Sequence, residues 1–303
     1  MKFFNFLLNS KKRIEVNSKY ISRITSDIIG FIYGIIGYVS LFVPLNEVLP
    51  DEYNIWNKIL ISTIILIILW FLCFLIVSFF TIRKKRNEIV SINNGFKIYI
   101  QYGDLFSENE VINSLKRRNI VIPVNRCFDT IVDDNIISTQ TLHGKLFKKL
   151  YDQNVYTEES LNNLIQQQLI NKKFEQIDEN EKSAGNRKRY EIGTIVKVNA
   201  TEREQYWLWG LSSFKNGLTA QTTMEEYCCA VQKLIEACDN KSDGFPVVIP
   251  LVGAGLSRTN RSQEDIIQYL ISAFKLNKDK LNSDIHIIVK EELKNKISIF
   301  NIN

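Results

Sequence analysis

The chain has 303 residues, a net charge of +5 and 45% hydrophobic residues. This length fits one domain with an appended segment. Basic residues gather before the first apolar stretch, and Arg83-Lys84-Lys85-Arg86 follow directly after the second, so the charge favours a membrane partner over nucleic acid. With five cysteines, no CxxC pair and two histidines, the chain is expected to hold no structural zinc and to occupy a reducing compartment.

Two apolar stretches near the N-terminus predict a transmembrane hairpin over residues 25–82, with spans at about 28–49 and 59–82. The connection between them is acidic, whereas the other flanks are basic. The positive-inside rule then places both termini, including the basic segment 1–24, in the cytoplasm. No Asp, Glu, Lys or Arg lies in the cores of the spans, which favours an anchor or assembly surface over a transporter.

A basic linker, residues 83–94, is expected to lead into an α/β domain over residues 95–303. Short apolar runs predict strands, and segments with helical spacing predict helices between them. An inserted helical section is expected at about 145–189, and the order of elements indicates a mixed sheet. The strands are expected at 96–102, 120–125, 190–199, 205–214, 247–249 and 284–290, with helices at 108–118, 223–238 and after residue 262.

A glycine loop follows one of the expected strands. The run Val247-Val248-Ile249 precedes Pro250, and Gly253 and Gly255 then bracket Ala254. Glycines let a backbone approach a ligand closely and turn its amides together toward an anion. Because a helix is expected after the loop, the arrangement is typical of a phosphate cradle. A plain tight turn is the alternative interpretation.

Polar residues end two other strands. Asp104 follows the first strand, where its carboxylate can accept hydrogen bonds from an adenine amine or a ribose, or can cap the next helix. Asn125 ends the second strand, at the position where ligands bind in α/β sheets, although it can also start a turn.

The segment 126–144 is long and polar, which suggests that it closes over a ligand. Asp129 and His143 are its candidate binding residues. A lone histidine is often just a surface residue. No second His or Cys at ligand spacing supports a metal site.

Four motifs in order resemble a macro domain, the module that binds ADP-ribose. They are Gly103-Asp104-Leu105, the apolar strand that ends in Asn125, Gly193-Thr194, and the loop Pro250–Gly255. The resemblance implies a three-layer α/β/α domain. It also implies that Asp104 and Leu105 hold adenine and Asn125 the distal ribose. The diphosphate would then lie on Val252, Gly253, Ala254, Gly255 and Leu256.

The chain departs from the macro pattern in one place. The loop that follows the strand-ending Asn is usually rich in glycine and carries much of the family's hydrolase chemistry. Here residues 128–144 read FDTIVDDNIISTQTLHG instead. This departure indicates a specialised ligand and leaves no catalytic residue to nominate.

Two spans joined to a divergent macro domain resemble the membrane effectors of type II Thoeris, a bacterial anti-phage system. That resemblance implies a TIR-domain partner that makes histidine-ADP-ribose from NAD. The macro domain would bind this signal, and homo-oligomers would then disrupt the inner membrane and abort the infection. The polar loop, with Asp129 and His143, is expected to read the amino-acid end of the signal.

Three functions therefore stay open. The first is a receptor–effector that needs no cofactor and is not an enzyme. The second is a membrane-tethered hydrolase of ADP-ribose derivatives, in which Asn125 or Asp129 would position water. The third is a tethered interaction domain with a vestigial pocket.

Overall fold

The computed structural model describes residues 2–42, 54–91, 95–111, 117–215, 219–252 and 261–302. The chain divides into two compact units. The first combines residues Met1–Lys85 with Glu292–Asn303, and the second is Arg86–Glu291.

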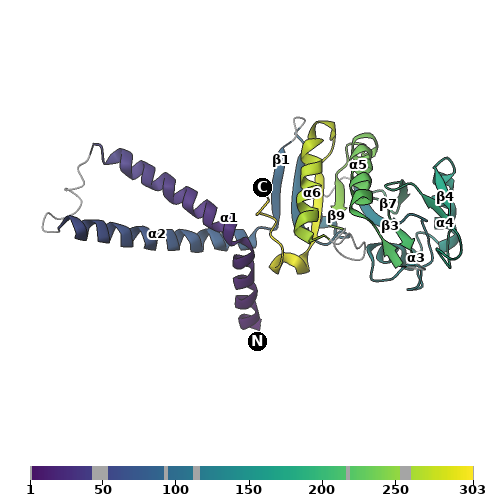
Figure 1. Cartoon of the computed structure of the whole chain (residues 1–303), viewed down its shortest axis with the longest axis horizontal. Coiled ribbons are helices and arrows are strands. Elements are labelled where there is room, and N and C mark those ends of the chain that lie inside the picture. Colours follow the sequence, from purple (N-terminus) through teal and green to yellow (C-terminus); the bar gives the residue numbers. More distant parts are fainter. Residues whose placement is uncertain are drawn as a thin grey trace. The chain divides into compact units, whose positions relative to one another are not determined.

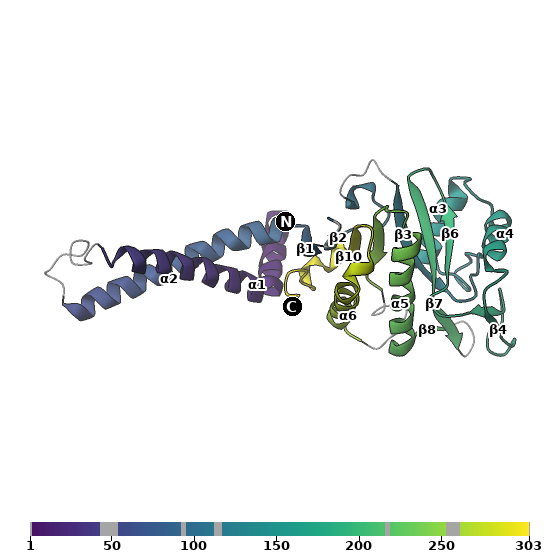
Figure 2. The ribbon, with the colours of Figure 1, turned by 90° about the horizontal axis from the view of Figure 1, so that it is seen from above.

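The first unit is a pair of long helices, α1 (Lys2–Val39) and α2 (Ile55–Arg83), which lie side by side (Figures 1 and 2). Trp70 of α2 donates its indole N–H to Ser26 Oγ of α1 at 3.5 Å. Among the described residues one helix, α2, is long and apolar enough to cross a membrane, with a mean hydropathy of 3.1 and no burial in its apolar window. The other predicted span, 28–49, is helical to Val39, and its residues 43–49 lie outside the described ranges.

The second unit is built on one mixed sheet with the strand order β1-β2-β10-β9-β3-β7-β6, and β8 pairs with β7. The five strands β2, β10, β9, β3 and β7 run parallel, and β1, β6 and β8 add antiparallel edges. The strands are β1 (Arg86–Ser91), β2 (Lys97–Gly103), β3 (Arg118–Asn125), β6 (Ile195–Asn199), β7 (Glu204–Lys215), β8 (Thr219–Gln221), β9 (Val247–Pro250) and β10 (Ile285–Lys290).

Helices cover both faces of this sheet. Successive residues of β7 point to opposite faces. Trp209 donates to the Ala230 carbonyl of α5 at 3.2 Å, whereas Leu208 packs in the core with Leu146 of α3. The layers are thus α5 (Met224–Lys241) with α6 (Gln263–Leu276) on one face and α3 (Leu142–Asp152) with α4 (Glu158–Leu169) on the other. The predicted three-layer α/β/α fold with a mixed sheet is confirmed.

Three local expectations differ from the structure. The expected linker 83–94 contains β1, which pairs with β2 and forms the sheet edge. In place of a helix over 108–118, the described residues show a 3-10 turn, Glu108–Glu110, and residues 112–116 lie outside the description. The strand expected at 190–199 is interrupted because Gly193 has a left-handed φ of +75° and forms a turn with Thr194.

The section expected at 145–189 holds most of α3, all of α4 and a small two-stranded sheet. This sheet pairs β4 (Phe174–Gln176) with β5 (Lys188–Tyr190). Residues 292–302, expected to close the α/β domain, belong instead to the unit of the two long helices.

Candidate functional site

The parallel strands bring the predicted ligand positions to one edge of the sheet. Asp104 follows β2, Asn125 ends β3, and Leu251 and Val252 follow β9. Because β2, β10, β9 and β3 are parallel neighbours, all these ends lie on the same side, hereafter the carboxyl edge. With strands about 4.8 Å apart, the edge spans about 14 Å from β2 to β3. Ligands bind at such edges in α/β sheets.

At the β2 end of this edge, a tight turn leaves the Asp104 side chain exposed. Its Oδ1 accepts from the Phe106 amide at 3.1 Å, and its own amide donates to Glu110 Oε1 at 3.1 Å. Leu105 is buried. The turn therefore fixes an exposed carboxylate beside an apolar side chain, an arrangement that suits the predicted contact with adenine.

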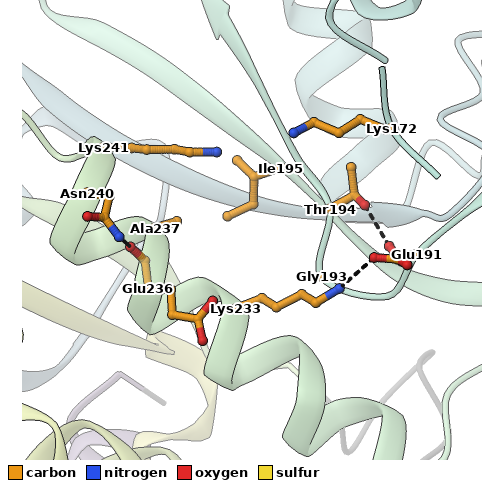
Figure 3. Close-up of a pocket in the computed structure, with 10 residues that line it drawn as sticks. All are labelled: Lys172, Glu191, Gly193, Thr194, Ile195, Lys233, Glu236, Ala237, Asn240 and Lys241. Atoms are coloured by element: carbon orange, nitrogen blue, oxygen red, sulfur yellow. Dashed lines mark hydrogen bonds and ion pairs between the residues drawn. The ribbon is translucent and has the colours of Figure 1, made fainter. Parts of the chain in front are cut away.

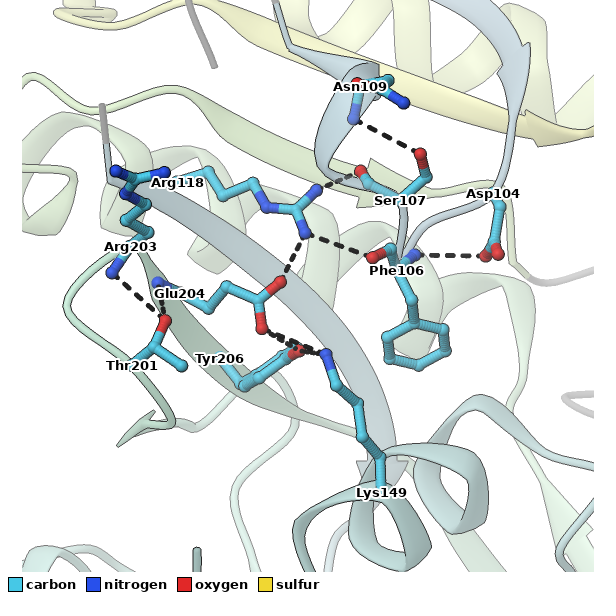
Figure 4. A network of polar contacts seen from close by, with 10 residues as sticks. All are labelled: Asp104, Phe106, Ser107, Asn109, Arg118, Lys149, Thr201, Arg203, Glu204 and Tyr206. Carbon is cyan, nitrogen blue, oxygen red and sulfur yellow. Dashed lines mark hydrogen bonds and ion pairs between the residues drawn. The ribbon is translucent and has the colours of Figure 1, made fainter. Parts of the chain in front are cut away.

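A buried polar network holds this turn from behind (Figure 4). The guanidinium of Arg118 donates to the carbonyls of Phe106 and Ser107 and to Glu204 Oε1. Lys149 of α3 donates to Glu204 Oε2 at 3.1 Å and to the Tyr206 hydroxyl at 3.0 Å. Burial raises the pKa of Tyr206 above its ordinary range, so this hydroxyl stays protonated. The network thus ties the segment after Asp104 to β3, β7 and α3.

At the β3 end, Asn125 organises the start of the polar loop. Its side chain is buried, and its Oδ1 accepts from the amides of Cys127 at 3.1 Å and Asp129 at 3.4 Å. The structure therefore shows the turn that the sequence allowed as an alternative. Contact with a ribose stays a prediction.

Asp129, predicted to read the ligand, forms a buried ion pair. Lys182, fully buried, approaches its carboxylate to 2.8 Å, and the Asn186 amide donates to Oδ1 at 2.6 Å. Burial raises the pKa of Asp129, against the opposing effect of Lys182. Gly185 lies against the pair with a φ of +78°, and an added Cβ there would overlap Asp129 Oδ1. The pair fastens the polar loop to the segment before β5.

His143 is likewise inside the protein, so the surface position weighed for it from the sequence is wrong. It lies in the first turn of α3, is 5% exposed and packs edge-on against Phe147 with ring centroids 4.5 Å apart. Burial lowers its pKa to about 3, which keeps the imidazole neutral.

The exposed acids of the polar loop are Asp133 and Asp134, which the sequence did not single out as binding residues. Backbone amides of Ile136 and Asn135 bond Asp133, and that of Thr139 bonds Asp134, which lowers the pKa of both. Their fixed negative charges are the ones this loop offers to a ligand. Asp133 and Asp134 differ from Asp129 in being exposed, although all three lie in the same loop. This difference in burial could be seen only in the structure.

At the β9 end, the Leu251 amide donates to the Ile288 carbonyl of β10 at 2.9 Å, and Val252 is half-buried. The predicted phosphate residues Gly253, Ala254, Gly255 and Leu256 lie outside the described residues. Beyond the loop, α6 starts with a capping box between Ser262 and Asp265. A strand before the loop and a capped helix after it agree with the sequence prediction.

Comparison with known proteins identifies the domain. A model of the macro domain of the Thoeris protein ThsA matches residues 98–290. The chain belongs to the ThsA macro-domain family. It is also 27% identical, over 231 residues, to the Thoeris protein ThsA of Bacillus amyloliquefaciens (strain Y2). The aligned region covers 75% of this chain and 73% of that protein. The predicted resemblance to a Thoeris macro domain is thereby confirmed, and the chain is tied to anti-phage defence.

Figure 3 shows a hollow in this ThsA-type macro domain. It measures about 290 Å³ and lies between α5 and the turn before β6. Lys233 of α5 pairs with Glu191 at 3.2 Å across it. A Cβ on Gly193 would come within 2.9 Å of Lys233 Cβ, so this motif glycine serves close packing on α5. Its lining residues are Lys172, Glu191, Gly193, Thr194, Ile195, Lys233, Glu236, Ala237, Asn240 and Lys241.

Across the described ranges, no group of three or more His, Cys, Asp and Glu side chains is placed to hold a metal ion.

Proposed function

We propose that the chain is a receptor–effector whose macro domain binds an ADP-ribose derivative along the carboxyl edge. Adenine lies by Asp104 and Leu105, the diphosphate on Val252, Gly253, Ala254, Gly255 and Leu256, and the distal ribose by Asn125. The observation that carries this proposal is that Asp104, Asn125 and Val252 follow or end strands along one edge of a ThsA-type macro domain.

The signal in this proposal is histidine-ADP-ribose, supplied by a TIR-domain partner. The polar loop 126–144 recognises its amino-acid end. Asp129 and His143 shape this loop from inside, where their contacts set the position of its backbone. Asp133 and Asp134 present exposed carboxylates that attract an ammonium or imidazolium group.

The hairpin in this proposal crosses a bacterial membrane twice with both termini in the cytoplasm, and a contact within the first unit favours termini on one side. Residues 9–20 of α1 hydrogen-bond residues 295–301, so both segments lie on one side of any membrane. If α2 crosses once, the chain between Ile21 and Asn54 must also cross. This argument favours the predicted hairpin, although among the described residues one helix alone is long and apolar enough to cross a membrane.

The effector then acts by assembly. A ligand drives assembly only if it binds the assembled state more tightly than the monomer. Because α2 exposes an uncharged apolar surface, homo-oligomers of the hairpin are the proposed membrane-disrupting species.

Dye-filled liposomes that contain the full-length protein test this function. Leakage is expected after addition of histidine-ADP-ribose and not after addition of ADP-ribose at the same concentration. The variant Asp104→Ala should need more conjugate to give the same leakage. Leakage independent of the conjugate, or absent at saturating conjugate, would contradict the proposal.

The tethered hydrolase is the less favoured function. Asn125 Oδ1 already accepts two amides, and Asp129 is paired with Lys182, so both side chains that would position water are engaged by the protein itself. The family match is to a Thoeris protein rather than to a hydrolase. Chromatography of the same reactions would show whether the conjugate is cleaved.

A further inference from the structure

The C-terminal segment hydrogen-bonds two backbone groups of α1. Asn301 Nδ2 donates to the Val16 carbonyl at 2.9 Å, and Asn301 Oδ1 accepts from the Tyr20 amide at 3.0 Å. Val16 and Tyr20 are four residues apart, so an undisturbed helix would pair these two groups with each other. One side-chain amide thus bonds both of the backbone groups that a regular helix pairs with each other.

A second contact fixes the turn that presents Asn301. Ser298 Oγ donates to Asn17 Oδ1 at 2.6 Å and accepts from the amides of Phe300 and Asn301, each at 3.0 Å. Asn17 is 3% exposed, and its Nδ2 donates to the Arg13 carbonyl of the preceding turn at 2.7 Å. Asn295 adds hydrogen bonds with Arg13 and Asn9, each at 3.0 Å.

Apolar burial completes the contact. Ile297 and Ile299 are buried, and the ring of Phe300 lies 5.2 Å from that of Tyr20. Lys84, at the end of α2, lies 5.8 Å from the Phe300 ring centroid. The segment therefore touches both long helices, at the side of the hairpin where the charged residues lie.

The helix bends along its length. Figure 1 shows the first turns of α1 leaving the line of the rest of the helix. Sharp bends in helices have identifiable causes, and a side chain inserted into the i→i−4 ladder is one of them. Proline, the commonest cause, does not occur in α1. We assign the bend to Asn301, because its side chain bonds both Val16 and Tyr20.

We propose that residues 291–302, the C-terminal clasp, are an autoinhibitory element that holds α1 bent and keeps the hairpin from assembling. The clasp begins immediately after β10, whose end lies at the carboxyl edge between β2 and β9. Once the clasp is released, Val16 and Tyr20 can pair, and α1 can form one straight helix. The inference that the clasp restrains assembly rests on the proposed function, whereas the inference that it bends α1 does not.

The first test measures the bend in full-length protein in nanodiscs without ligand. Spin labels on non-canonical residues at Lys12 and Phe31 avoid the five native cysteines. In a straight helix these positions are about 28 Å apart. We expect a shorter distance in the wild type and a shift toward the straight value in Asn301→Asp, which keeps the shape but loses the donor to Val16. Ser298→Ala should shift it in the same direction.

Asn277→Ala is the matched control, because Asn277 Nδ2 also bonds a helix carbonyl, that of Ala273, within α6. It should leave the distance unchanged. An unaltered distance in both clasp variants would overturn the proposal, since the bend would then come from α1 itself.

The second test measures self-association in detergent by sedimentation, again without ligand. Asn301→Ala, which removes both Asn301 hydrogen bonds, should lower the protein concentration for half-assembly roughly tenfold. Asn277→Ala should match the wild type. Straightening of α1 without enhanced assembly would overturn the autoinhibitory role. Failure of the proposed signal function has a different signature, namely a wild type that does not respond to histidine-ADP-ribose while the clasp variants still assemble.

Discussion

Asp129 and His143 show why single residues mislead when they are considered by type alone. Both are polar residues in a loop next to an expected ligand edge, which favours a binding role. The structure places Asp129 against Lys182, 53 positions further along the chain, and His143 against Phe147. No local pattern connects Asp129 with Lys182, because the pairing depends on how the inserted section folds back. Asp104, by contrast, acts within its own turn, and its exposed position could be predicted.

Replacing Lys182 should destabilise the macro domain strongly. In Lys182→Met the Asp129 carboxylate is left buried without its partner, which typically costs about 3–5 kcal/mol. Urea unfolding of full-length protein in nanodiscs, followed by the emission of buried Trp207 and Trp209, measures this loss. The matched variant Lys233→Met breaks the exposed pair with Glu191 and should cost less than about 1 kcal/mol. An equal decrease in the free energy of unfolding in the two variants would show that the buried pair stabilises the fold no more than the exposed pair does.

Acid should weaken the fold through the two histidines. The pKa of both His143 and His286 is lowered to about 3 by burial, whereas an unfolded histidine titrates near 6.5. Below about pH 6.5 the unfolded chain therefore binds protons that the folded chain refuses, and stability falls as the pH drops toward 3. Each histidine contributes about 1.4 kcal/mol per pH unit.

The variant His143→Gln should remove about half of this histidine-dependent slope between pH 5.5 and pH 4.5, whatever its stability at neutral pH. Urea unfolding at each pH measures the slope. An unchanged slope would mean that His143 is protonated in the folded protein.

At the scale of elements, the central strands could be predicted and the edge strand could not. The runs that form β3, β9 and β10 are β-branched and buried on both faces, a pattern that marks parallel strands. The sequence of β1, RNEIVS, is polar, and its residues are half-buried or exposed, as suits a strand that pairs on one side only. Its position next to β2 depends on the antiparallel pairing, which composition does not reveal.

The position of β1 predicts where a soluble fragment must begin. Arg86 bonds Gln101 and the Glu110 carbonyl, and β1 covers the backbone of β2. A fragment of residues 86–291 should elute as a monomer in size-exclusion chromatography. A fragment of residues 95–291 exposes the β2 edge and should aggregate. Equal elution of the two fragments would show that β1 is dispensable.

For the whole molecule, the order of short motifs along the chain was the main basis of the prediction. Four short motifs in sequence indicated a macro domain, and the two apolar spans before it indicated a Thoeris protein. The family match confirms a Thoeris macro domain. The C-terminal clasp escaped prediction because its contacts join residues more than 280 positions apart, such as Arg13 and Asn295. The same contact supplies the argument for two membrane crossings and for the restraint on α1.

The most direct test of the central claim is calorimetric titration of full-length protein in nanodiscs with histidine-ADP-ribose and with ADP-ribose. We expect saturable binding of the conjugate, weaker binding of ADP-ribose and no product after incubation. In Asp104→Ala we expect a reduced affinity for the conjugate. Asp239→Ala, an acidic residue of α5 away from the carboxyl edge, serves as the control and should bind normally. Absence of binding, or steady release of product, would contradict the receptor–effector account.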